Sequence, residues 1–132
     1  MNRFLADVAR ALEVDAVSLE TAFRQCEGWC SLKAFGLLVL LENDWGAPVT
    51  LAEFQTLRTV RDLYRVAFVA FAAEVLQVSR TSLSGATERG TLPEWDSIGH
   101  LRLVMEAERR FGVRYPLESV ADLRRLDDFL VS

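Results

Sequence analysis

Two serines stand in matching surroundings and could carry chemistry. Ser97 follows Asp96 and precedes a stretch with helical periodicity, and Ser31 stands in the same setting 66 residues earlier, after Cys30. A serine in the first turn of a helix lies beside unpaired backbone N–H groups and the positive end of the helix dipole, which together favour a phosphate group. The same position also suits a serine with no chemistry, because serine is a common helix cap.

A hydrolytic site is the second chemistry that these residues suggest. Ser97 and His100 lie three residues apart and therefore share a helix face, and Asp96 is adjacent. A catalytic triad requires the acid to orient the histidine and the histidine to reach the serine, which neighbours within one helical turn rarely achieve. The first half of the chain has Ala34 where His100 stands. We therefore predict that the chain is not an enzyme and that His100 is an exposed helix residue near the serine.

The chain repeats itself at an offset of 66 residues. Residues 29–32 (WCSL) match residues 95–98 (WDSI), and further upstream the offset becomes 64. The change of offset predicts two additional residues in a loop of the second copy, which we expect near residues 85–93. Self-similarity of this kind indicates two related domains, residues 1–65 and 66–132. The offset of 66 also pairs Phe35 with Leu101, Leu38 with Val104, Trp45 with Phe111 and Leu57 with Leu123.

Each half predicts a small bundle of helices. Apolar residues keep a helical period at 4–12 and at 69–76, and a longer helix follows each serine. Gly46 and Gly112 come after the last aromatic residue of those longer helices, where a terminating glycine is expected. Neither half shows the alternation of a strand, so the predicted fold class is all-α. We expect the longer helices to bury Leu32, Phe35, Leu38 and Leu41 in the first half, and Ile98, Leu101, Val104 and Phe111 in the second.

No linker separates the two halves. Residues 63–71 contain no Gly, Pro or Ser, whereas a flexible tether would be rich in them. We predict that the last helix of the first half continues, with little or no break, into the first helix of the second. The apolar residues 66–73 then form an interface between the halves or between two chains. A homodimer could use either this segment or the apolar face of the first repeat.

Composition excludes several classes of protein. The 132 residues are 51% hydrophobic and 26% charged with a formal net charge of -4, which does not suit a protein that binds duplex nucleic acid. The longest apolar runs are far short of the roughly 20 residues that span a membrane. The N-terminus is a poor signal peptide, so we expect a cytoplasmic protein with no membrane partner. Cys26 and Cys30 are too few for a disulfide scaffold and, with His100, too few for a metal site.

The pattern around the serines closely resembles the acyl carrier proteins. In the second half the match consists of residues 96–98 (DSI), an apolar-striped helix, Phe111 fourteen residues after the serine, and then Gly112. Residues 31–46 keep the same spacing in a looser match, so the resemblance covers both halves. The sequence is most similar to the discrete carriers of biosynthetic clusters, because the Gly-Gly-His-Ser signature of peptide-synthetase carriers is absent.

The resemblance implies a fold, a cofactor and partners. The fold is a tandem of two acyl-carrier-like four-helix bundles. In carriers the serine hydroxyl is joined by a phosphodiester to 4′-phosphopantetheine, whose thiol holds an acyl group as a thioester, which implies attachment at Ser97 and Ser31. The implied partners are a phosphopantetheinyl transferase and the enzymes that load and process acyl groups in fatty acid, polyketide-like or other specialised biosynthesis. The implied docking residues are Asp96, Ile98, Met105 and Glu106 in the second half, and Leu32 and Val39 in the first.

The first half departs from the family at Cys30, where the second half has an aspartate. By the resemblance, that aspartate helps the transferase to recognise the carrier, and a neutral thiol does not supply its charge. Loss of an aspartate cap also costs roughly 0.5–2 kcal/mol of stability. Ser97 is therefore the favoured site, and a carrier-fold scaffold with one or no modified serine is the alternative. Residues 37–41 are apolar without a break, so in this half we expect Val39 and Leu40 to be buried rather than docked.

Overall fold

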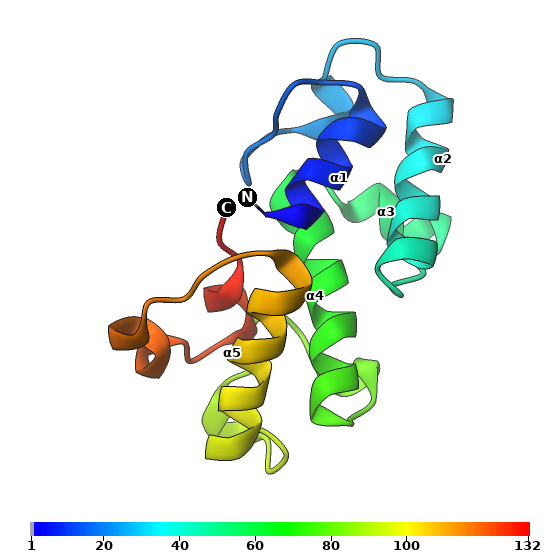
Figure 1. Cartoon of the computed structure of the whole chain (residues 1–132). Coiled ribbons are helices and arrows are strands. Elements are labelled where there is room, and N and C mark those ends of the chain that lie inside the picture. Colours follow the sequence, from blue (N-terminus) through cyan, green and yellow to red (C-terminus); the bar gives the residue numbers. More distant parts are fainter. Residues whose placement is uncertain (1) are drawn as a thin grey trace.

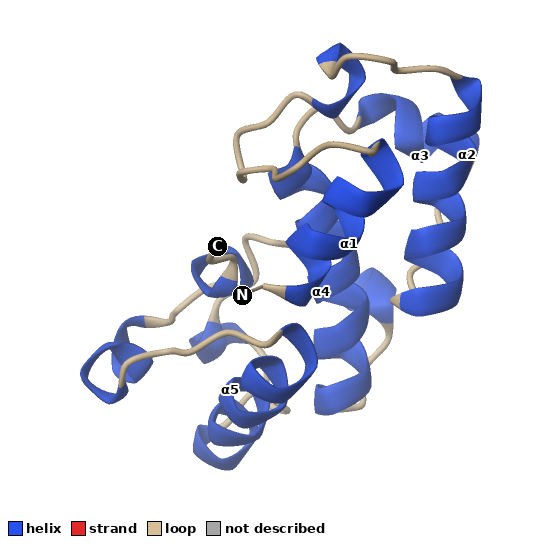
Figure 2. Cartoon of the chain, turned by 45° about the horizontal axis from the view of Figure 1, so that its top comes forward, coloured by secondary structure: helices blue, strands red, loops and turns tan. Residues whose placement is uncertain are grey.

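The computed structural model describes residues 2–132 and is all-α, as the sequence predicted (Figure 1). Loops join the helices, and the part of the chain from residue 2 to residue 132 contains no β-strand (Figure 2). The helices are α1 (Arg3–Leu12), α2 (Ser31–Val39), α3 (Leu51–Thr56), α4 (Val60–Leu76) and α5 (Ser97–Phe111). A π-helical turn at Leu40–Asp44 continues α2, and 3-10 turns lie at Phe23–Gln25, Arg80–Ser82, Arg89–Thr91, Leu117–Asp122 and Leu126–Phe129.

The repeat is visible in the backbone hydrogen bonds. Isolated β-bridges pair Ala22 with Thr59 in the first half and Glu88 with Arg125 in the second, and both members of the pair are shifted by 66 residues. The carbonyl of the residue before each bridge follows the same rule. The amide of Val60 donates to the Thr21 carbonyl at 2.9 Å, and the amide of Leu126 donates to the Thr87 carbonyl at 3.3 Å. The two halves therefore share a local fold that the sequence repeat anticipated.

The position of the two additional residues differs from the prediction. Helices α1 and α4 end alike, with the left-handed residues Glu13 (φ 59°) and Gln77 (φ 58°), at an offset of 64. The amide of Ser18 donates to Thr21 Oγ1, and the amide of Ser84 makes the same bond to Thr87, already at an offset of 66. The extra residues therefore lie before Ser84, in the segment that forms the 3-10 turn Arg80–Ser82, and not at 85–93.

Helix α4 crosses the predicted boundary at residues 65 and 66 without interruption. It begins with a capping box in which the Thr59 side chain accepts the Asp62 amide and the Asp62 side chain accepts the Thr59 amide. With no Gly or Pro to stop it, the helix runs to Leu76. The expectation of one continuous helix is confirmed, and the two repeats are joined by a rigid element.

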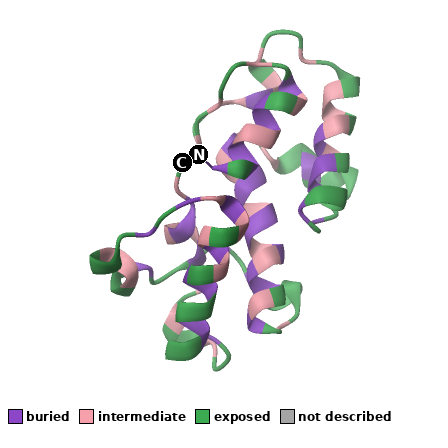
Figure 3. Ribbon diagram, in the orientation of Figure 1, coloured by how far each residue is buried: buried purple, intermediate pink, exposed green. Residues whose placement is uncertain are grey.

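The core between the halves is built from aromatic rings. Trp45 and Phe111, which occupy equivalent positions in the two repeats, stack at 4.8 Å between ring centroids. Phe4 packs on Trp45 at 5.2 Å, while Tyr64 and Phe68 each pack on Phe111 at 5.4 Å. Helix α4 supplies buried residues to this core from within the segment 66–73, namely Ala67, Phe68, Ala70, Ala72 and Ala73 (Figure 3). The repeats therefore share one core, and most of the segment considered for a homodimer is buried inside the chain.

The buried stripe of the long helices was wrongly predicted. Leu32 and Phe35 are 77% and 63% exposed, and Ile98 and Leu101 are 69% and 56% exposed. The stripe that α5 does bury begins with a glycine and a histidine, which hydrophobic periodicity does not count as core residues. In α2 nearly every position is apolar, so periodicity does not define a phase there. The buried residues are Leu37, Leu40 and Leu41 in the first repeat, and Gly99, His100, Leu103, Val104, Ala107 and Phe111 in the second.

Candidate functional site

Ser97 is the first residue of α5 and is exposed. Asp96 is the N-cap residue, and its Oδ1 accepts the backbone N–H of Gly99 at 2.7 Å. The cap leaves the serine hydroxyl at the open, positively polarised end of a 15-residue helix. A nucleophilic hydroxyl, an adjacent carboxylate and a helix N-terminus thus lie together on the surface, as the sequence predicted.

Gly99 allows the loop before Ser97 to lie close to the helix. A Cβ atom at Gly99 would stand 2.7 Å from the carbonyl oxygen of Glu94 and 3.2 Å from Asp96 Oδ1. Any other residue would therefore push the loop away and disturb the cap. The first repeat has Lys33 at this position, and its ammonium lies 3.5 Å from the carbonyl oxygen of Glu27. The two serine loops consequently pack in different ways.

Ser31 is likewise the first residue of its helix, α2, and is exposed. Its neighbour Cys30 occupies the N-cap position in an extended conformation but makes no side-chain cap hydrogen bond. The expectation that Cys30 is a poor cap is confirmed. Cys26 and Cys30 are free thiols, and Cys26 lies 4.0 Å from the carbonyl oxygen of Ala22. The first repeat therefore presents a serine without the carboxylate and without the cap of the second.

His100 does not lie on the surface as predicted, since only 4% of the residue is exposed. The indole N–H of Trp95 donates to His100 Nδ1 at 3.0 Å, so Nδ1 is the acceptor. His100 Nε2 lies 2.8 Å from the carbonyl oxygen of Val120 and therefore carries the proton. Because both ring nitrogens are engaged in the core, the imidazole does not act as a base for the Ser97 hydroxyl in this arrangement.

Burial is the main cause that lowers the pKa of His100 below its ordinary value. The Val120 carbonyl, which accepts the Nε2 proton, opposes this effect and raises the pKa. The positive charge of Arg89 lowers the pKa further. The balance favours a neutral imidazole, which is the form that the hydrogen bonds to Trp95 and Val120 require.

Exposed apolar residues occur at matching positions in the two repeats. We call them the first and second apolar sets. On α2 and α5 they are spaced three and then four residues apart, which places them on one face of each helix. Leu51 and Leu117 begin the segment that follows. The first set is Leu32, Phe35, Val39 and Leu51, and the second set is Ile98, Leu101, Met105 and Leu117.

The apolar sets include some of the predicted docking residues and add others. Leu32, Ile98 and Met105 are exposed as a docking role requires, and Asp96 is exposed beside them. Val39 is exposed rather than buried, whereas Leu40 is buried as expected. Glu106 is half-buried, and its carboxylate pairs with Arg109 at 2.6 Å. The residues that sequence reasoning missed are Phe35, Leu101, Leu51 and Leu117, although the repeat offset already paired Phe35 with Leu101.

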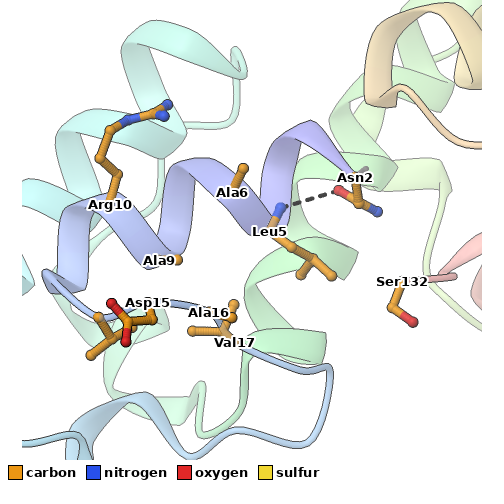
Figure 4. Close-up of a pocket in the computed structure, with 10 residues that line it drawn as sticks. Asn2, Leu5, Ala6, Ala9, Arg10, Asp15, Ala16, Val17 and Ser132 are labelled. Carbon is orange, nitrogen blue, oxygen red and sulfur yellow. Dashed lines mark hydrogen bonds between the residues drawn. The ribbon is translucent and has the colours of Figure 1, made fainter.

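An open groove of about 590 Å³ lies elsewhere, between α1, the loop at residues 14–17 and the C-terminal Ser132. Leu5, Ala16 and Val17 point toward one another across its apolar part (Figure 4). Neither serine lines this groove. It is therefore separate from the candidate modification sites.

The comparisons with known proteins return no relatives: no protein-family model, no curated protein and no solved structure matches this chain. Residues 2–132 contain no group of three or more His, Cys, Asp or Glu residues that could hold a metal ion. In the same part of the chain no helix is both long and apolar enough to cross a bilayer. The function is therefore argued from the serine sites and their surroundings.

Proposed function

We propose that the chain is a tandem acyl carrier protein made of two four-helix, carrier-like repeats, residues 1–65 and 66–132. Ser97 carries 4′-phosphopantetheine, and its thiol holds acyl intermediates as thioesters for partner enzymes of fatty acid, polyketide-like or other specialised biosynthesis. The observation that supports this most strongly is the exposed Ser97 hydroxyl at the capped N-terminus of α5, directly after Asp96. The resemblance of residues 96–112 to carrier motifs agrees with this geometry.

The helix N-terminus stabilises a phosphodiester on Ser97 but does not install it. An exposed anion at a helix N-terminus gains about 0.3–1 kcal/mol, which is too little to drive a covalent modification. A phosphopantetheinyl transferase must therefore recognise the serine and its surroundings. Asp96 supplies a negative charge next to the hydroxyl, and Ile98 supplies an exposed apolar contact one residue after it.

The second apolar set supports docking of partner enzymes beside the arm. Ile98, Leu101 and Met105 line one face of α5, next to the serine. Exposed apolar residues gathered on one face are typical of interaction surfaces. The first apolar set offers the same spacing beside Ser31. Because α2 and α5 start at opposite ends of the molecule (Figure 1), each repeat presents its serine to a separate partner.

The alternative function is a carrier-fold scaffold in which the first repeat docks partners but bears no arm. Cys30 supports this, because it provides neither a cap hydrogen bond nor a charge next to Ser31. In this form the protein has one modified serine, Ser97, and two docking surfaces. We expect Ser97 to be modified faster than Ser31 in either case.

Intact-protein mass spectrometry tests the proposal. The full chain is incubated with coenzyme A, magnesium and a broad-specificity phosphopantetheinyl transferase, as wild type, Ser31→Ala and Ser97→Ala, with Ser82→Ala as an exposed-serine control. We expect one added arm that disappears in Ser97→Ala and persists in Ser82→Ala. A second arm that is lost in Ser31→Ala would make both repeats carriers. No added mass on the wild type would overturn the carrier function and leave an unmodified interaction module.

A further inference from the structure

The segment that follows the long helix is held differently in the two repeats. In the first repeat α3 has its own capping box, in which Thr50 Oγ1 accepts the Glu53 amide at 3.1 Å and Glu53 Oε1 accepts the Thr50 amide at 3.0 Å. In the second repeat Leu117–Asp122 is a 3-10 turn that begins after Pro116, with no side-chain cap. A 3-10 turn has poorer hydrogen-bond geometry than an α-helix, so this segment depends on contacts from outside.

His100 and Arg89 supply those outside contacts. His100 Nε2–H donates to the Val120 carbonyl at 2.8 Å, and the Arg89 guanidinium donates to the Ala121 carbonyl at 3.2 Å. Of the two donors, His100 also reaches the serine loop, because its Nδ1 accepts the indole N–H of Trp95. Trp95 is buried and stands two residues before Ser97. One imidazole therefore joins the serine loop to the 117–122 segment.

The first repeat lacks this connection. Ala34 occupies the position of His100, and Trp29, the counterpart of Trp95, is half-buried and packs on Phe23 at 5.6 Å. A methyl side chain neither donates nor accepts a hydrogen bond. The first repeat thus serves as an internal control for anything that His100 does in the second.

We propose that His100 is a positioning residue that clasps the serine-bearing end of α5 to the 117–122 segment, and that protonation of its ring opens this clasp in the second repeat alone. A protonated imidazole carries N–H groups on both nitrogens. The Trp95 indole would then point its N–H at a second N–H, so that hydrogen bond would be lost. The bond to Val120 would persist, so the serine loop is the part that is released.

The charges around the ring keep the clasp closed at neutral pH. Arg89, from the Arg89–Thr91 turn, is the charged group that acts against protonation. The groups that face the ring from its other neighbours, Trp95 and Phe129, are uncharged. The Asp96 carboxylate accepts the Gly99 amide, so it is committed to the helix cap. On the remaining neighbours Glu118 and Asp122 are exposed, while Asp128 Oδ2 accepts the amides of Arg124 and Arg125.

NMR titration of the full chain tests the clasp directly. The ring nitrogen shifts of His100 report its tautomer, the indole signals of Trp95 and Trp29 report the two serine loops, and amide exchange reports residues 117–122 and 51–56. We expect the Nε2–H tautomer at neutral pH. As the pH falls and His100 protonates, we expect a shifted Trp95 signal and roughly tenfold faster exchange in 117–122, the scale of losing one hydrogen bond. Trp29 and residues 51–56 should not follow this titration.

Two variants separate positioning from simple packing. His100→Gln keeps one acceptor and one donor but does not titrate, so we expect a folded chain whose Trp95 signal no longer responds to His100 protonation. Trp95→Phe keeps a ring but removes the donor to Nδ1, so we expect a higher pKa for His100. This second variant decides the question if His100→Gln does not fold. The clasp is overturned if the Trp95 signal ignores His100 protonation, if the response persists in His100→Gln, or if Trp95→Phe leaves the pKa unchanged.

The inference does not depend on the modification of Ser97. The clasp consists of hydrogen bonds within the unmodified chain, and its test uses no transferase or acyl group. An absent arm in the mass measurement together with a responsive Trp95 signal would remove the carrier function and keep the clasp. The converse pair of results would keep the carrier function and remove the clasp.

Discussion

At the scale of single residues, one neighbour distinguishes the two serines. Asp96 caps α5 through the Gly99 amide, whereas Cys30 leaves α2 without a side-chain cap. Both serines are exposed and both begin a helix. The difference between the repeats as modification sites therefore resides in position 30 against position 96. Because the rest of the setting matches, this difference can be tested by exchange.

Substitution of Cys30 by a capping residue should stabilise the chain. In Cys30→Asp the introduced carboxylate can accept the amide of Lys33, and a gained cap is worth roughly 0.5–2 kcal/mol in the free energy of unfolding, measured in urea. Cys30→Asn provides the cap without the charge. We expect both variants to gain stability and only Cys30→Asp to speed arm attachment at Ser31. Equal attachment rates in the two variants would show that charge plays no part in recognition.

The burial of His100 predicts a pH-dependent stability. Its folded-state pKa is lowered, mainly by burial, relative to the unfolded value of about 6.5. Between these two values the unfolded chain binds a proton that the folded chain does not, so stability rises with pH in this window. The contribution of His100 is complete above about pH 6.5 and is lost as the pH falls through the lower folded-state value.

Urea denaturation at a series of pH values measures this contribution. We expect wild type to lose more stability than His100→Gln as the pH falls below about 6.5. The carboxylates, including Asp62 and Asp128 with their lowered pKa values, are the same in both chains, so the difference between the curves isolates His100. Parallel curves would contradict the prediction.

At the scale of elements, sequence reasoning predicted the helices better than their faces. The two serine-led helices, the continuous α4 and the pairing of the repeats follow from capping residues, apolar spacing and self-similarity. The buried face of α5 did not follow, because it starts with Gly99 and His100. Their roles depend on a close backbone approach and on Trp95 and Val120, partners that helical periodicity does not identify. The π-helical turn at Leu40–Asp44 also lacks a sequence signal of its own.

A helix-breaking residue at the centre of α4 tests its part in joining the repeats. Val66→Pro removes a backbone donor and clashes with the preceding turn, which costs about 3 kcal/mol or more in a helix interior. Val66→Ala removes the side chain but keeps the helix and is the matched control. We expect the proline variant to lose most of its stability and the alanine variant to lose little. A proline variant as stable as the alanine variant would mean that the repeats do not depend on a continuous helix.

At the scale of the whole molecule, the repeats meet through equivalent residues. Trp45 stacks on Phe111, and the Arg110 guanidinium lies 3.9 Å from the centroid of the Trp45 ring. Arg110 also donates to the carbonyl of Asp44, its counterpart in the first repeat. Two positions thus each meet their own counterpart across the contact, as in an isologous interface between identical subunits. The tandem behaves physically like a dimer whose subunits have been fused through α4.

Such a shared core predicts that the two repeats unfold together. Trp45→Ala removes the ring that Phe4 and Phe111 contact, which should lower the free energy of unfolding by roughly 3–5 kcal/mol. Trp29 and Trp95 report one repeat each, so their indole signals can be followed separately through a urea titration. We expect coincident transitions in the wild type, and an equal shift of both transitions in the variant.

Leu51→Ala, which truncates an exposed residue, should shift neither transition. NMR relaxation should give one tumbling time for both repeats, because α4 and the aromatic rings hold them as one body. Separate transitions for Trp29 and Trp95, or two tumbling times, would mean that the repeats fold as independent carriers. Coincident transitions would instead imply that damage to the first repeat also lowers the stability of the Ser97 site, so a scaffold repeat would be retained for the stability that it lends to the other.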